Sequence, residues 1–158
     1  MRPGLHIGAS AAIHTTVRQD MVATFDELGP VHPVYATWNL VRHMEEASRK
    51  VILPYLDDDE DAVGHSVEVV HLSPTLVGRP VVVTAHVSAI EDRRITCNVV
   101  AHSHPQGQPA DHAALIGRGR TVQIVVEKAW LAARLAALGQ PATESPAPPP
   151  QDAPQHKA

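Results

Sequence analysis

The sequence has little of several features that would point to particular functions. Among its 158 residues there is one cysteine, Cys97, which excludes an internal disulfide and fits a reducing, cytoplasmic compartment. Only 3% of the residues are aromatic and the formal net charge is −4, which argues against nucleic acid as a main partner. No apolar run approaches the length that crosses a membrane, and the N-terminus lacks an unbroken apolar signal segment. We therefore expect a soluble cytoplasmic protein with neither a nucleic-acid nor a membrane partner.

The last part of the chain, residues 139–158, differs in composition from the rest. It holds a large share of the chain's 14 prolines and no large apolar side chain. Such a segment cannot bury enough apolar surface to offset its ordering entropy, so we expect a disordered, Pro-rich tail. The remaining residues, 1–138, are numerous enough to form one domain around its own core.

The segment from Thr37 to about Leu53 is strongly helical in its pattern, because its apolar residues recur with a period near 3.6. Glu45 falls beside the apolar face of this helix, whereas Glu46 points to solvent. Residues 13–23 favour an irregular strand. Residues 25–35 are punctuated by Gly and Pro and are interpreted as a loop, which is a candidate lid or pocket wall.

Four runs with strand character follow the helix. They cover residues 65–72, 80–90, 94–104 and 113–126, and short turns connect them. A short last helix is expected over 129–138. The order of a strand, a long helix and then antiparallel strands predicts an α+β fold in which the helix packs on one face of an antiparallel sheet.

Three side chains are candidates for chemistry: Thr37 and Glu45 on the helix and His71 on the first strand after it. A hydroxyl, a carboxylate and an imidazole that meet across a helix–strand contact can carry out acyl transfer. Each has a structural alternative. A threonine at a helix start is usually an N-cap, a carboxylate at the buried edge of a helix can bond the backbone, and a lone histidine on a half-buried strand is more often structural.

Two further patterns have simpler explanations. His102, His104 and His112 lie close in sequence, but no carboxylate or cysteine is spaced to complete a metal site with them, so no metal is expected. The glycines at 117 and 119 lack the context of a phosphate loop, and they predict a bulge or a close approach of the backbone to a ligand.

Several local sequences together carry a family resemblance. They are Val-Tyr-Ala-Thr at 34–37, Met-Glu-Glu-Ala at 44–47, Pro-Tyr-Leu at 54–56, the run at 63–78 and Val-Glu-Lys at 126–128. In their order and spacing, the chain resembles the fluoroacetyl-CoA thioesterase-like branch of the hot-dog thioesterases. The resemblance implies a hot-dog fold, hydrolysis of a small or medium acyl-CoA thioester, a homodimer, and no cofactor apart from the CoA of the substrate.

The resemblance also implies roles for individual residues. Thr37, Glu45 and His71 match the catalytic set of the family, and Gly64 matches a glycine whose backbone borders the acyl group. Tyr35 and Arg120 are assigned with Gly64 to substrate binding.

Two features of the family have no clear match. A basic residue usually stands in a Gly-x-His-x-Arg setting, where this chain has Gly-Arg-Gly-Arg-Thr at 117–121, so Thr121 or a shifted Arg120 takes that place. The lid aromatics linked with fluoroacetate have no counterpart, since Phe25 is the only phenylalanine. We therefore expect the thioesterase chemistry without the fluoroacetyl specificity. The alternative is a non-hydrolytic hot-dog protein, either a hydratase-like enzyme or a module that binds and protects an acyl ligand.

Overall fold

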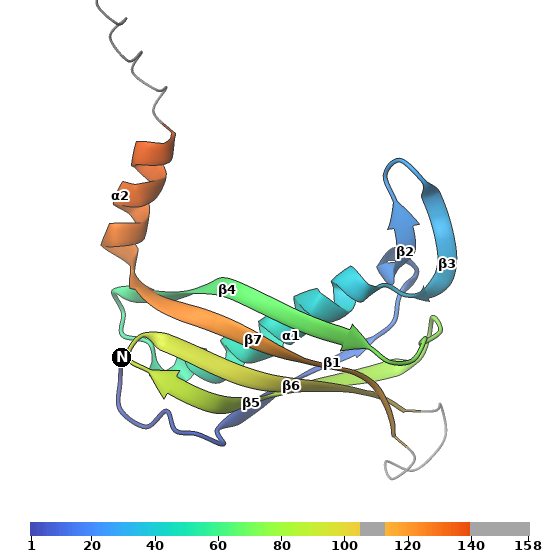
Figure 1. Cartoon of the computed structure of the whole chain (residues 1–158), viewed down its shortest axis with the longest axis horizontal. Coiled ribbons are helices and arrows are strands. Elements are labelled where there is room, and N and C mark those ends of the chain that lie inside the picture. Colours follow the sequence, from blue (N-terminus) through green and yellow to red (C-terminus); the bar gives the residue numbers. More distant parts are fainter. Residues whose placement is uncertain (105–112, 140–158) are drawn as a thin grey trace, which may run out of the picture.

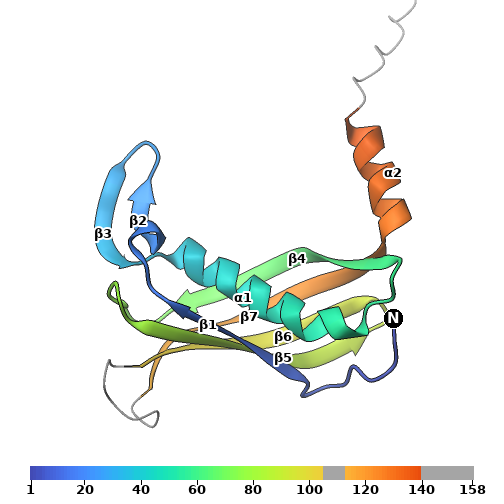
Figure 2. The ribbon, with the colours of Figure 1, turned by 180° about the vertical axis from the view of Figure 1, so that it is seen from behind.

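One long helix, α1 (Thr37–Ile52), crosses one face of a curled antiparallel sheet (Figures 1 and 2). The computed structural model describes residues 1–104 and 113–139. The sheet has the strand order β1-β5-β6-β7-β4. Its strands are β1 (Ser10–Thr16), β4 (Glu60–His71), β5 (Pro80–Glu91), β6 (Arg94–Ser103) and β7 (Ala114–Glu127). The predicted α+β architecture, a helix on one face of an antiparallel sheet, is confirmed.

The segment before α1 differs from the prediction. The expected strand over 13–23 is divided into β1, the short 3-10 helix η1 (Gln19–Met21) and the start of β2 (Val22–Phe25). The expected loop over 25–35 is wrong, because β3 (Gly29–Tyr35) pairs with β2 in a separate two-stranded sheet. Pro30 and Pro33 are typical of a loop, so the sequence pattern did not predict this strand. A strand with an unpaired edge nevertheless tolerates proline.

The four strands after α1 lie where the sequence predicts them. The largest difference is that β4 begins at Glu60, five residues before the predicted start at 65. Asp61 is held there by an ion pair of 2.5 Å with Arg49 of α1. A short 3-10 helix, η2 (Leu53–Tyr55), contains Pro54 and ends the long helix as expected.

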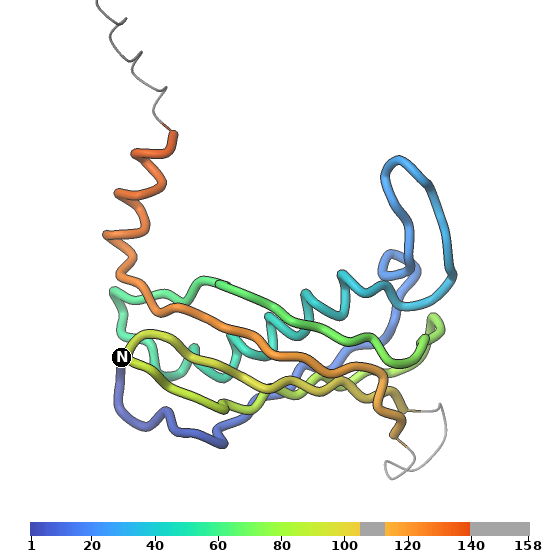
Figure 3. Tube along the Cα trace, viewed as in Figure 1, coloured from blue at the N-terminus to red at the C-terminus, as the bar shows by residue number. Residues whose placement is uncertain are grey.

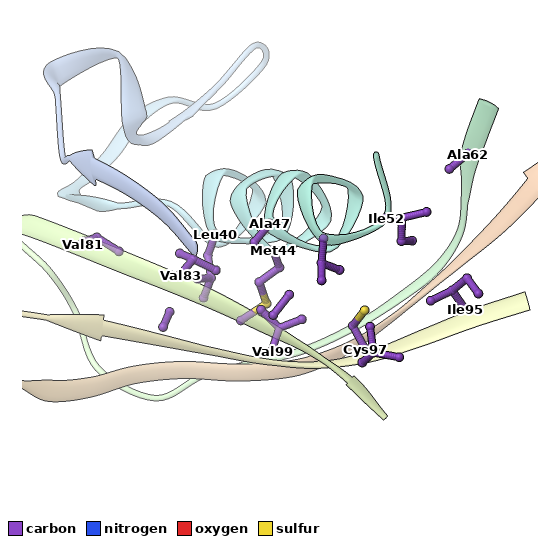
Figure 4. Packing of buried hydrophobic residues seen from close by; sticks show 14 of the residues in the cluster. Leu40, Met44, Ala47, Ile52, Ala62, Val81, Val83, Ile95, Cys97 and Val99 are labelled. Carbon is purple, nitrogen blue, oxygen red and sulfur yellow. The ribbon is translucent and has the colours of Figure 1, made fainter. Parts of the chain in front are cut away.

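The core lies between α1 and the sheet (Figure 4). Leu40, Met44 and Ala47 on the helix are fully buried, and they face alternate residues of the central strands such as Val83 and Val99. Burying an aliphatic side chain of this size stabilises the fold by about 1.5–3 kcal/mol. The helix therefore has a fixed rotation on the sheet, which also fixes the directions of its polar residues.

Two glycines of β7 let α1 lie close to the sheet. A Cβ on Gly117 would meet the side chain of Leu40 at 2.7 Å, and one on Gly119 would overlap the backbone carbonyl of Glu68 and approach the sulfur of Met44 to 3.1 Å. The close approach at these glycines is thus to the chain's own helix and neighbouring strand, whereas the sequence predicted a bulge or a close approach to a ligand.

The C-terminal helix, α2 (Lys128–Leu138), stands away from the sheet (Figures 1 and 3). None of its residues is buried, and Trp130 is 57% exposed. The predicted disordered tail, 139–158, lies outside the described residues except for Gly139. Within the described ranges, no helix combines the length and the apolar character needed to cross a membrane.

Candidate active site

Thr37 and His71 meet at the first turn of α1. The Thr37 hydroxyl lies 3.1 Å from Nδ1 of His71, which is the last residue of β4. In the tautomer with the hydrogen on Nε2, the hydroxyl donates to Nδ1, as a nucleophile does to its base. The Nε2 atom of His71 is buried, and it meets no hydrogen-bond partner among the described residues. The structure therefore brings two of the three predicted catalytic groups together.

Thr37 is not the N-cap that its position in the sequence suggested. Ala36 takes the cap position with an extended backbone, and no side chain caps the helix there. The start of α1 is held instead by Met21, whose carbonyl accepts hydrogen bonds from the Ala36 amide at 2.9 Å and from the Asn39 side chain at 3.1 Å. Because other groups fix the helix end, the Thr37 hydroxyl is free to form its hydrogen bond with His71.

The environment of His71 favours a neutral imidazole. Burial lowers the pKa of His71 below its ordinary value, and the nearby backbone of Ser73 acts in the opposite direction. A neutral imidazole at pH 7 can accept a proton, which is what a general base must do.

A pocket of about 380 Å³ opens beside this pair. Its lining includes Thr37 and His71, and also residues of the β2–β3 hairpin and the first turn of the helix. Phe25 of the hairpin and Trp38 of α1 pack edge to face across it, with ring centroids 5.0 Å apart. The predicted role of this segment as a pocket wall is consistent with that lining, although the wall is a hairpin and not a loop.

Tyr35 lines the same pocket, but its hydroxyl is already engaged. It donates to Nδ1 of His43 at 2.5 Å, and both side chains are buried. Burial raises the pKa of Tyr35 and lowers the pKa of His43, so the pair is neutral at pH 7. Within this chain Tyr35 therefore acts as a wall, and its ring packs edge-on against His71 at 6.2 Å.

Glu45 lies elsewhere, against Gly64 of β4. A Cβ on Gly64 would overlap Oε1 of Glu45, and the carboxyl carbon lies 3.1 Å from that Cβ position. Arg49, one turn further along α1, bonds to Asp61 and to the carbonyl of Ala62. Glycine at position 64 is what gives the Glu45 carboxylate its place on the sheet.

The third predicted catalytic group is thus separated from the other two. Glu45 follows Thr37 by eight residues, which is about 12 Å along a helix axis. Within one chain, the structure does not bring Glu45 to the Thr37–His71 pair, and its place in the same catalytic set stays a prediction. The physical reason is that the helix runs along β4, so that Thr37 meets its end and Glu45 meets its first half.

Arg120 is exposed on the opposite face of the sheet. Gly119 and Thr121, its neighbours on β7, both face α1, and side chains alternate along a strand. Arg120 lines an outer depression together with Glu68 and Arg118. The single chain therefore does not bring Arg120 to Gly64 or Tyr35, and its assignment to substrate binding stays a prediction.

Sequence reasoning missed Trp38, which lines the pocket, and His43, which holds the hydroxyl of the pocket residue Tyr35. Trp38 follows the threonine at the helix start and does not belong to the apolar face that the helical period defines. In the structure it is 42% exposed. His43 stands on the helix eight residues after Tyr35, and that spacing was the available signal for the buried pair. Among the described residues, no group of three or more His, Cys, Asp or Glu side chains is placed to hold a metal ion.

The chain is similar in sequence to known thioesterases. The family model described as FlK, fluoroacetyl-CoA-specific thioesterase, matches residues 17–129. A fluoroacetyl-CoA thioesterase of Streptantibioticus cattleyicolor is 35% identical over 89 residues, which are 56% of this chain and 63% of that protein.

Two solved structures are similar over most of their length. A hypothetical protein of Thermus thermophilus, described as a thioesterase superfamily member, has a TM-score of 0.80 and 41% identity, over 87% of this chain and 95% of its own. The fluoroacetyl-CoA thioesterase FlK has a TM-score of 0.74 and 25% identity, over 87% of this chain and 99% of its own. The fold is therefore the hot-dog fold that the sequence predicted.

The lowered pKa of His71 predicts a pH dependence of stability. Below a pH of about 6.5 the unfolded chain binds a proton at His71 that the folded chain does not, so the free energy of unfolding falls as the pH falls. Urea unfolding at about pH 7.5 and pH 5.5 should show this fall, and the His71→Gln variant should show less of it. An equal fall in both proteins would contradict the assignment.

Proposed function

Because the chain belongs to the family of fluoroacetyl-CoA-specific thioesterases, we propose that it hydrolyses an acyl-CoA thioester with a small or medium acyl group. The chain spans 63% of the length of the curated relative that it matches. The observation that carries the proposal is the Thr37–His71 hydrogen bond of 3.1 Å at the mouth of a pocket with an otherwise largely apolar wall. No cofactor is proposed, and CoA enters as part of the substrate.

In this proposal His71, Glu45 and Thr37 have different catalytic roles. His71 and Glu45 activate water or the attacking group, and Thr37 either orients its partner or attacks the thioester itself. The first N–H groups of a helix have no acceptor within the helix, and those of Thr37 and Trp38 belong to residues that line the pocket. These amides, or the backbone beside Gly64, would bind the thioester oxygen as negative charge develops on it.

We also propose that the active form is a homodimer joined along β4. This strand is an edge of the sheet, and residues near its end, Val70 and Leu72, are 49% and 44% exposed. An unpaired edge with exposed apolar side chains favours self-association. The apolar residues Val81, Val83, Ala85 and Val87 of β5 are buried and take no part in this exposed surface.

An antiparallel β4–β4 pair would also reunite the catalytic groups. In such a pair the two strands run in opposite directions, so the first half of one β4, which carries Gly64, lies toward the end of the other β4, which carries His71. Glu45 would then act beside the Thr37–His71 pair of its partner. Light scattering should give about twice the chain mass of 17.0 kDa.

The acyl specificity is proposed to differ from that of a fluoroacetyl-CoA thioesterase. The sequence has one phenylalanine, Phe25, and it packs on Trp38 at the pocket in place of a set of lid phenylalanines. A cytoplasmic location is proposed because the one cysteine, Cys97, is a free and buried thiol.

The function is tested with a panel of acyl-CoAs of increasing chain length and a thiol reagent. Continuous release of free CoA from at least one short or medium acyl-CoA is the expected result. Saturable binding of acyl-CoA without release of CoA would instead support the non-hydrolytic module, and hydration of an enoyl-CoA would support the hydratase-like enzyme.

The Glu45→Gln variant should fold normally and lose at least about a hundredfold in kcat, since it keeps the shape of the side chain and removes the base. Glu46→Gln is the matched control, because Glu46 directly follows Glu45 on the helix and is exposed. It should retain the kcat of the wild type. Equal losses in the two variants would contradict the assignment of Glu45.

A further inference from the structure

Gln123 of β7 is buried in the core with an unused acceptor. Its side chain is 1% exposed, and its Oε1 atom has no hydrogen-bond partner among the described residues. A buried polar atom without a partner destabilises a fold, so each such atom in a native structure needs an explanation.

The surroundings of Gln123 do not supply a structural reason for the amide. Ile95, its register partner on β6, is fully buried and apolar, and Val125, the next residue on the same face, is 1% exposed. The neighbouring polar pair is satisfied, since the Thr121 hydroxyl donates to Ser48 at 2.6 Å. An apolar side chain at position 123 would fit this environment without leaving an orphaned oxygen.

Gln123 is paired with the glycine that the Glu45 carboxylate covers. Its register partner on the other side, in β4, is Gly64, and opposite residues of an antiparallel pair have Cβ positions about 5 Å apart on the same face. The carboxyl carbon of Glu45 lies 3.1 Å from the Cβ position of Gly64. The two methylenes and the carboxamide of Gln123 are long enough to cover this separation, so its amide can reach the Glu45 carboxylate over Gly64.

We propose that Gln123 is a catalytic residue that holds the attacking water together with Glu45, an inference that rests on the proposed thioesterase function. A water molecule has two hydrogens, and a general base takes only one of them. An acceptor at Gln123 Oε1 would bind the other hydrogen and thereby aim a lone pair of the water at the thioester carbon.

In the hydrolytic step, the atoms of one water molecule are divided between the acid and CoA. The water oxygen forms a bond to the carbonyl carbon, and the bond from that carbon to the CoA sulfur breaks. One hydrogen of the water passes as a proton to Glu45 and then to the departing sulfur. The other stays on the new carboxyl group, hydrogen-bonded to Gln123 until the acid leaves. The products are the free acid and CoA thiol.

The first test compares Gln123→Met with Thr75→Val. Thr75 also has a buried oxygen without a partner in the described part of the chain, and it is not among the residues that line the Thr37–His71 pocket. Both variants should keep or raise Tm. Gln123→Met should lower kcat about tenfold to a hundredfold with KM within about twofold, the size expected for one lost hydrogen bond to a reacting group. Thr75→Val should keep the kcat of the wild type.

The second test uses methanol as a competing nucleophile, and it does not depend on how much enzyme is folded. Methanol gives its one hydroxyl hydrogen to Glu45 and has a methyl group where water has its second hydrogen. Gln123→Met, or Gln123→Leu as a second variant, should therefore shift the ratio of free acid to methyl ester toward the ester. A wild-type kcat and an unchanged product ratio in an active protein would overturn the role of Gln123 alone. A wild type that releases no CoA from any substrate would overturn the thioesterase function itself.

Discussion

Helix α1 lies against three glycines of the sheet, Gly64 on β4 and Gly117 and Gly119 on β7. At each of these positions a Cβ would meet a side chain of the helix or the backbone of the next strand at a distance that real structures do not allow. The depth and rotation of the helix depend on this contact. With the buried face fixed by Leu40 and Met44, the hydroxyl of Thr37 is directed to the end of β4, and the carboxylate of Glu45 to its first half.

The same constraint divides the functional groups into two places about 12 Å apart along the helix. One is the Thr37–His71 pair, with its pocket and aromatic wall. The other is Glu45 over Gly64, with Gln123 on the adjoining strand. The first place lacks the carboxylate and the amide acceptor, and the second lacks the hydroxyl and the imidazole. A symmetric pair of chains joined at β4 would bring the first place of one chain beside the second place of the other. The proposed dimer would therefore complete the active site.

Much of this arrangement could be predicted from the sequence. The period of α1, the alternation in the four later strands and the fates of Glu45 and Glu46 follow from local patterns. The β2–β3 hairpin could not be predicted, since Pro30 and Pro33 on an unpaired edge resemble a loop. The role of Gln123 depends on strand register, because only the pairing of β7 with β4 places it opposite Gly64. No local signal in a single sequence carries that information.

The central claim is that one active site combines Glu45 from one chain with His71 from the other, and mixing of subunits tests it most directly. Glu45→Gln and His71→Ala proteins, each inactive alone, are unfolded together, refolded and assayed for release of CoA. Random pairing makes half of the dimers mixed, and each mixed dimer has one intact site, so about a quarter of the wild-type activity should return. A mixture that contains mixed dimers and stays inactive would place the two residues in the same chain and contradict the shared site.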